Sequence, residues 1–202
     1  MSHCRCRSLT LALIVLALAA IAALPAGAQP GVGVGSVTID FSSFNADPTT
    51  IVEFEGDHYA LEGIHFSAPC GADGCGILEV GFVQGDAALR QRPFAGAMEA
   101  TLSRPISDIA VRFAPMTQGT ATYVLTAYGA SGAALATTST TVTQDFGDPD
   151  NVGFGYIDLS LDDLPAPAKR LTLESIFVRS SFEFVDAIDF GVSSIAYTHW
   201  GT

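Results

Sequence analysis

Short runs in which apolar and polar residues alternate recur along this chain from residue 36 onward, and turn-forming residues separate them. Ser36–Phe41 and Phe154–Leu161 are the clearest examples. A period of two is typical of strands that bury one face. The predicted core faces of these two strands consist of Val37, Ile39 and Phe41 in the first run, and of Ile157, Leu159 and Leu161 in the second.

The whole pattern predicts an all-β fold of about ten antiparallel strands and no helix, in one domain over residues 36–202. Ser103–Pro105 is expected to link two separate strands, since Pro blocks helix continuation and fits a connection. Gly129 and Gly132 are expected to supply the positive φ of a tight hairpin. The predicted strands are Ser36–Phe41, Thr50–Phe54, Gly63–Ser67, Gly76–Gln84, Ala97–Leu102, Asp108–Phe113, Ala121–Tyr128, Ala133–Val142, Phe154–Leu161, Leu171–Val178 and Ala187–Tyr197.

A single jelly-roll-like β-sandwich is the natural closure for that number of strands. In such a sandwich Ile39, Phe113 and Ile188 are expected to share one interior. Asp162–Ala168 contains two prolines and is predicted to be a loop.

The N-terminal residues 1–28 have the layout of a secretory signal peptide. Arg5 and Arg7 precede an apolar run, Leu9–Leu24, and small residues follow at Ala26–Ala28. An uncleaved membrane anchor is the alternative, but the run is shorter than the roughly 20 residues that span a bilayer. We therefore expect a secreted, periplasmic or extracellular protein that starts at Gln29, with residues 29–35 as a flexible leader.

The charge balance excludes some partners. Loss of Arg5 and Arg7 with the signal changes the formal net charge from −12 to −14. A chain this acidic repels nucleic acid and anionic membrane surfaces, so neither is an expected partner. The charge favours a soluble exported protein, and it is compatible with a surface that attracts divalent cations.

Two cysteines remain after the signal, Cys70 and Cys75, in a glycine-rich loop. In an oxidising compartment this spacing favours a disulfide. It would fix a loop rather than hold the fold together, since so small a ring removes little chain entropy. A zinc site would need two further ligands, and no other Cys remains.

Three segments carry a resemblance to a known type of domain: Val37–Phe41, Tyr59–Phe66 and Ala187–Phe190, with Phe94–Phe113 and the Tyr123–Leu135 hairpin between them in the same order. The chain resembles the jelly-roll domains of secreted bacterial proteins that are similar to carbohydrate-binding modules. One departure is Phe190, which follows Asp189 where that type commonly has a second acidic residue. The resemblance implies a binding module without catalytic activity.

The resemblance also implies a structural calcium ion that bridges the first and last strands. The matching ligands would be Asp40 and Asp189, with Glu53 or Glu55 as a third. Calcium prefers several oxygen ligands of this kind. Alternation points both aspartates outward, which fits a site at the rim and equally fits two solvated carboxylates.

A second acidic stretch lies in the loop 144–151. Its acidic and amide side chains could wrap a cation, but their order does not match an EF-hand. The same residue types form ordinary turns, so both interpretations stay open. The residues concerned are Asp145, Asp148, Asp150 and Asn151.

Catalytic signatures are absent from the sequence: there is no Gly-x-Ser-x-Gly elbow and no His-Glu-x-x-His motif. The three histidines beyond the signal are scattered, and His65 is expected to be a surface or hydrogen-bonded strand residue. For sugar binding, Tyr59 and Trp200 are the candidate aromatic platforms among the available amphipathic rings, which are Tyr59, Tyr123, Tyr128, Tyr156, Tyr197 and Trp200. Trp200 would alternatively pack over an open end of the sandwich.

Together these features predict a secreted, non-catalytic binding or surface-associated module, with an extracellular glycan or surface component as ligand and calcium as a structural cofactor. The sequence leaves two alternatives. One is a secreted glycoside hydrolase with a carboxylate pair in a groove. The other is a structural matrix or envelope protein, which would expose an apolar patch or an unpaired edge strand.

Overall fold

The computed structural model describes residues 35–44, 51–68, 70–71, 74–83, 86–92, 97–115, 119–144, 155–179 and 190–201. The predicted signal peptide and nearly all of the leader lie outside these residues. So do Ile188, Asp189 and the acidic loop after Gln144.

The described chain is almost entirely β structure, as predicted. Its one helical element is a 3-10 turn, η1, at Phe41–Phe44. No described helix has the length and apolar character needed to cross a membrane. The strands are β1 Ser36–Asp40, β2 Val52–Glu53, β3 Ile64–Ser67, β4 Cys70–Gly71, β5 Gly74–Cys75, β6 Ile77–Val83, β7 Asp86–Arg92, β8 Ala97–Pro115, β9 Gly119–Gly129, β10 Ala134–Gln144, β11 Ile157–Leu161, β12 Ala168–Arg179 and β13 Phe190–His199.

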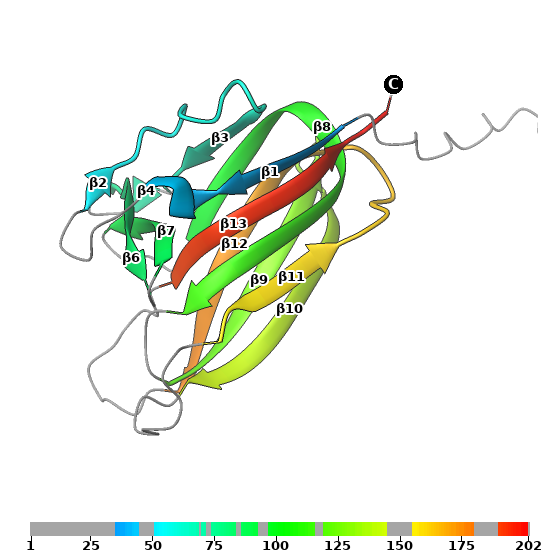
Figure 1. Cartoon of the computed structure of the whole chain (residues 1–202). Coiled ribbons are helices and arrows are strands. Elements are labelled where there is room, and N and C mark those ends of the chain that lie inside the picture. Colours follow the sequence, from blue (N-terminus) through cyan, green and yellow to red (C-terminus); the bar gives the residue numbers. More distant parts are fainter. Residues whose placement is uncertain are drawn as a thin grey trace, which may run out of the picture.

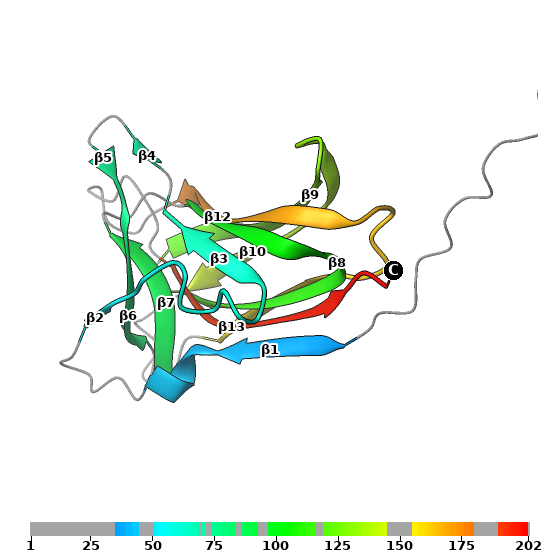
Figure 2. The same cartoon turned by 90° about the horizontal axis from the view of Figure 1, so that it is seen from above.

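One long strand, β8, belongs to both layers of the sandwich. Its residues 97–102 pair with β12 and β3, which gives a first layer in the order β10-β9-β12-β8-β3. Its residues 106–115 pair with β13 and β11, which gives a second layer in the order β1-β13-β8-β11. Figure 1 shows β8 arching from one layer to the other, and Figure 2 shows the two layers from above. All these pairings are antiparallel.

The sheet continues beyond the second layer through β7, β6 and β2. Val192 of β13 pairs with Leu89 of β7, and β6 then pairs with β7 along its whole length. The short strands β4 and β5 form a separate hairpin. The predicted all-β sandwich is therefore confirmed, with its two layers joined by one hydrogen-bonded path.

The core lies between the layers and follows the predicted alternation. Ile39 and Phe113 are both buried in the same cluster, as expected. The ring of Phe113 lies 5.6 Å from that of Tyr123 across the core and 5.5 Å from that of Phe190. The predicted core face of β11 is also confirmed, since Ile157, Leu159 and Leu161 are all buried.

The prediction that Ser103–Pro105 separates two strands is wrong, because β8 runs through these residues as it changes layer. The pairing of β12 with β8 skips from Thr101 to Ile106, and the pairing of β13 stops at Ile106. Pro105 has no N–H, but it lies where neither β12 nor β13 pairs with β8, so its position removes no hydrogen bond between these strands. The sequence pattern also missed β7, Asp86–Arg92, and predicted more residues for β2 than the two it has.

The predicted hairpin is confirmed as β9 and β10. Gly132 has a φ of 80°, which favours glycine, and its N–H donates to the carbonyl of Gly129. Gly129 itself is not among the described residues with positive φ, so one glycine and not a pair provides the left-handed conformation.

Candidate functional site

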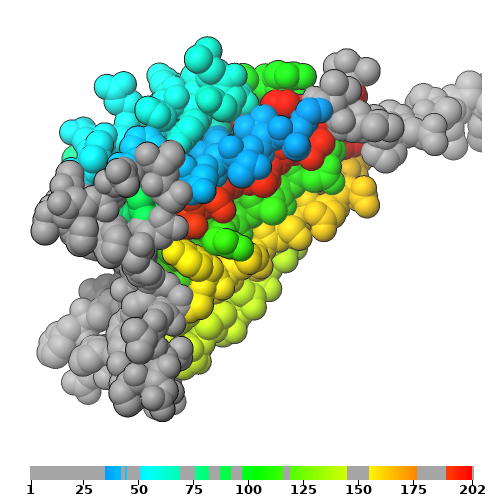
Figure 3. Space-filling model, in the orientation of Figure 1, coloured from blue at the N-terminus to red at the C-terminus, as the bar shows by residue number. Residues whose placement is uncertain are grey.

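The outer face of the second layer carries rows of polar side chains that cross four strands. These positions alternate with the buried core residues, so the pleat points them to solvent. Cross-strand register places Asp40, Ser194, Arg112 and Asp158 in one row, Thr38, Ala196, Ala110 and Ser160 in the next, and Ser36, Thr198 and Asp108 in a third. Figure 3 shows β1, β13, β8 and β11 as adjoining bands on this face.

Two adjoining depressions follow these rows and form what we call the outer groove. The first has a volume of about 290 Å³ and is lined by Arg112, Asp158, Ser160 and Ser194 among others. The second, of about 170 Å³, is lined by Ser36, Asp108, Asp162 and Thr198 among others. Both depressions include Ala110 and Ala196. Because these two side chains are small, the middle row forms the floor of the groove, and the hydroxyl-bearing and acidic side chains of the rows on either side form its walls.

Arg112 dominates the first depression electrostatically. Its Nε donates to Asp158 Oδ1 at 2.8 Å and its Nη2 to Asp158 Oδ2 at 3.2 Å, a two-pronged pair. The hydrogen bond and charge of Asp158 raise the pKa of Arg112 above its ordinary value, and Tyr156 and Asp40 add smaller contributions in the same direction. The guanidinium also lies 5.6 Å from the ring centre of Tyr156. Arg112 is therefore a fixed cation with a tyrosine ring beside it.

The second depression is acidic and held by local hydrogen bonds. Asp108 accepts from the Ser107 hydroxyl at 2.6 Å and from the Asp163 N–H at 2.9 Å. Asp162 accepts from the Ser160 hydroxyl at 3.3 Å. Oxygen atoms of fixed carboxylates and hydroxyls thus line both ends of the groove, with the alanine floor between them.

The metal residues predicted from the sequence are only partly placed. Asp40 is exposed at the end of β1, in the Arg112 row, and Glu53 is exposed on β2 opposite Glu79. Asp189 lies outside the described residues. Within the described ranges no group of three or more His, Cys, Asp or Glu side chains could hold a metal ion. The calcium site therefore stays a prediction.

The aromatic platforms predicted from the sequence do not line the outer groove. Tyr59 packs into a cluster of rings, edge-on to Phe41 at 5.7 Å and to His58 at 4.9 Å. Trp200 lies beyond β13, partly buried, and its backbone N–H donates to Pro105 O at 2.8 Å. Tyr156 is exposed and lies beside Arg112, although it does not line either depression.

The two cysteines predicted to form a disulfide face each other in the backbone pairing. Cys70 of β4 is directly opposite Cys75 of β5. Opposite residues of an antiparallel pair have Cα atoms about 4.5–5.5 Å apart, which is within the range that a disulfide spans. The pairing supports the predicted disulfide without testing it.

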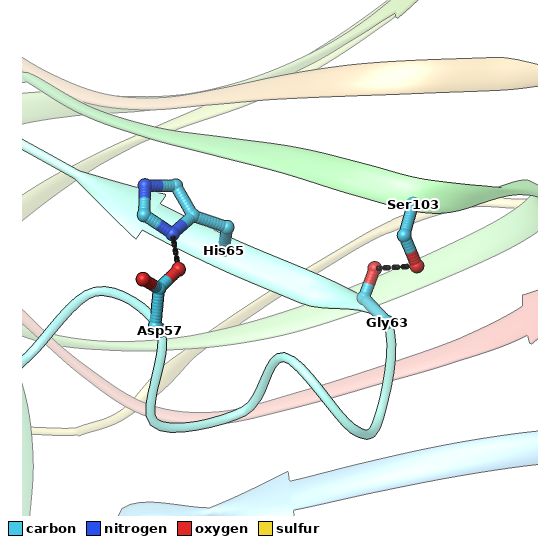
Figure 4. A network of polar contacts seen from close by, with 4 residues as sticks. All are labelled: Asp57, Gly63, His65 and Ser103. Carbon is cyan, nitrogen blue, oxygen red and sulfur yellow. Dashed lines mark hydrogen bonds and ion pairs between the residues drawn. The ribbon is translucent and has the colours of Figure 1, made fainter.

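A second polar cluster lies on the outer face of the first layer (Figure 4). The Nδ1 atom of His65 contacts Asp57 Oδ1, and the Ser103 hydroxyl donates to the carbonyl of Gly63 at 3.3 Å. His65 is exposed on β3 and hydrogen-bonded, as predicted. The two contacts are separate in Figure 4, so they do not assemble a histidine with a serine nucleophile.

No protein-family model matches the chain, and no curated protein does. Among solved structures, the K1 cleaved adhesin domain of Lys-gingipain from Porphyromonas gingivalis is 15% identical, with a TM-score of 0.39 over 83% of this chain and 100% of that one. The CBM22-2 xylan-binding domain of Paenibacillus barcinonensis Xyn10C is 12% identical, with a TM-score of 0.36 over 81% of this chain and 98% of that one. An arabinose-bound GH51 α-L-arabinofuranosidase is 13% identical, with a TM-score of 0.42 over 84% of this chain and 27% of that one. The chain thus weakly resembles carbohydrate-binding modules and adhesin domains, and TM-scores this low transfer no function to it.

Proposed function

We propose that this protein is an exported, non-catalytic module that binds a glycan along the outer groove. The observation that carries the proposal is the alanine floor, Ala110 and Ala196, between rows of hydroxyl, carboxylate and guanidinium groups on one sheet face. Such a surface lets a flat, hydroxyl-rich ligand approach the strands closely.

The groove chemistry matches a polyol. Each sugar hydroxyl both donates and accepts, and fixed carboxylates such as Asp158 and Asp162 can accept from it. Arg112 can donate, and Tyr156 offers the face of an aromatic ring at the same end. The groups are already held by hydrogen bonds in the described structure, so little side-chain order has to be gained on binding.

The charge of the groove narrows the class of glycan. Asp40, Asp108, Asp158 and Asp162 lie in or beside the groove, and Arg112 is the cation among its described lining residues. An acidic polysaccharide would be repelled by this field. We therefore propose a neutral glycan as the ligand.

The test is binding of purified exported protein to a glycan array, followed by calorimetry with the best neutral oligosaccharide. Ala110→Trp fills the floor of the groove and should lower affinity at least tenfold. Ala133→Trp, at an exposed hairpin position, is the matched control and should bind as the unmodified protein does. Absence of binding to every neutral glycan, with and without calcium, would contradict the proposal, as would equal affinities of the two variants.

A hydrolase is the second candidate, because two carboxylates, Asp108 and Asp162, line the same depression. Release of reducing ends from a bound glycan, abolished by Asp162→Asn, would replace the binding proposal with this one. The local hydrogen bonds of Asp108 and Asp162 favour a positioning role over an acid and base pair.

Export itself is tested at the N-terminus. We expect the protein recovered outside the cytoplasm to begin at Gln29. Its intact mass, measured by mass spectrometry, should be lower than that of the full chain by the mass of residues 1–28. Recovery of the full-length chain in the membrane fraction would support the alternative of an uncleaved anchor.

A further inference from the structure

The outermost strand of the first layer, β10, has a long edge that pairs with no described strand, and β11 of the second layer lies close to it. β10 pairs with β9 over Ala134–Gln144, and among the described strands it pairs with no other. Its register is regular from Ala136 onward, with one irregularity at the hairpin end. Half of the backbone N–H and C=O groups of such a strand point away from its neighbour, so they are available to another strand.

The composition of β10 offers none of the usual protection of an edge. Its eleven residues include no Lys, Arg, Asp, Glu or Pro. Natural edge strands are commonly short, charged or interrupted by Pro. The other described edges follow this rule, since β1 has five residues and ends in Asp40, β11 has five and contains Asp158, and β3 has four.

The side chains of β10 already pair with a second row of hydroxyl groups. Thr143 and Thr120 lie 2.9 Å apart between their Oγ1 atoms, Thr141 and Thr122 lie 2.8 Å apart, and Thr137 and Thr126 lie 3.2 Å apart. A strand that presents hydroxyls at alternate positions is complementary to any other strand that does the same. β10 therefore complements a copy of itself.

The net charge of the chain also favours the edge of β10 as the place where two copies make contact. At a formal net charge of −12, or −14 after signal cleavage, two copies repel over most of their surfaces. β10 is an uncharged strand eleven residues long, so two copies that meet along it bring no charged side chains of that strand together.

We propose that two copies of this protein associate through antiparallel pairing of β10 with β10, which joins their first layers into one continuous sheet. A two-fold axis at Thr140 would place Thr137 opposite Thr143 and Ser139 opposite Thr141 of the other copy. Such pairing adds about one backbone hydrogen bond per residue of the strand. The outer grooves lie on the second layer, on the opposite side of the sandwich core from the joined sheet.

The experiment is sedimentation velocity of the purified exported protein over a concentration series. We expect a dimer that dissociates on dilution and becomes tighter with added salt, because salt screens the repulsion between acidic copies. Ser139→Lys places two like charges beside the axis and should abolish the dimer. Ser139 lies opposite Val124, so this change removes no hydroxyl pair with β9.

Ala130→Lys is the matched control, since it adds the same charge at the exposed hairpin tip and should leave the dimer intact. Circular dichroism of both variants verifies that they fold, and Ser139→Ala, which keeps the edge uncharged, should still dimerise. A protein that is monomeric at every concentration overturns the proposal, and so does a dimer that survives Ser139→Lys or weakens with salt. Each of these outcomes is independent of glycan binding.

Discussion

The buried ion pair between Glu79 and Arg90 gives a sharp prediction about stability. The two residues are directly opposite on β6 and β7, and Arg90 Nε lies 2.7 Å from Glu79 Oε1. Their side chains are 12% exposed for Arg90 and 6% for Glu79. The guanidinium lies against Gly81, where an added Cβ would be 3.0 Å from Arg90 Cζ. Removal of Arg90 therefore takes this cation away from a buried carboxylate.

We expect Arg90→Met to lower the free energy of unfolding by about 3–5 kcal/mol, the usual cost of removing one partner of a buried ion pair. For a domain of this size each kcal/mol corresponds to about 2–4 °C in Tm. The double variant Glu79→Gln/Arg90→Met should recover most of the loss, because a neutral amide then takes the place of the buried carboxylate. Urea denaturation and thermal melting of the single and double variants measure both effects.

Arg112→Met is the matched control for Arg90→Met. Arg112 and Asp158 are also directly opposite on neighbouring strands, with a distance of 2.8 Å between Nε and Oδ1, but their side chains are 48% and 65% exposed. Solvent screens such a pair, so its loss should cost less than about 1 kcal/mol. Equal costs for the two variants would refute the reasoning that burial and not geometry decides the contribution.

Three further predictions follow from other residues. Burial, aided by Glu62, raises the pKa of Tyr197 to about 12, so the folded state keeps a proton that the unfolded state loses near pH 10. The contribution of Tyr197 to stability should therefore be complete below pH 10 and fall as the pH rises toward 12. Denaturation curves at several pH values should show a flatter dependence on pH for Tyr197→Phe. If Cys70 and Cys75 form the predicted disulfide, thiol titration of the unfolded chain should find no free thiol, and their joint replacement by Ser should cost at most about 2 kcal/mol, since the ring is small. If Asp40 is a calcium ligand, calcium at 100 times its Kd should stabilise the fold by about 2.7 kcal/mol relative to chelator, and Asp40→Ala should remove that difference in Tm.

The fold class was predictable because period-two alternation is a local property of the sequence. It placed the buried faces of β1 and β11 and the β9–β10 hairpin correctly. The continuity of β8 was not predictable in this way. Pro105 normally indicates the end of a strand, and only the three-dimensional structure shows that it lies between the pairing of β8 with β12 and that with β13. Strand β7 was missed because Ala87, Ala88 and Leu89 are all buried, so its sequence does not alternate.

The outer groove could not be predicted from the sequence for a different reason. Its residues come from four strands that are distant in the sequence, and only the register brings Asp40, Arg112 and Asp158 into one row. The floor residues Ala110 and Ala196 carry no local signal, since an outward alanine in a strand is unremarkable by itself. Asp40 was singled out for calcium, and its place beside Arg112 and Ser194 became visible through the pairing of β1 with β13.

The position of β13 has a consequence for the order in which the protein is built. β13 lies between β1 and β8 and also pairs with β7, yet it is the last described strand to leave the ribosome. Until β13 arrives, β1 lacks the strand with which it pairs among the described ones, and the second layer cannot close, so folding must wait until β13 has been synthesised. The two layers therefore close late, after nearly all of the described strands have been synthesised.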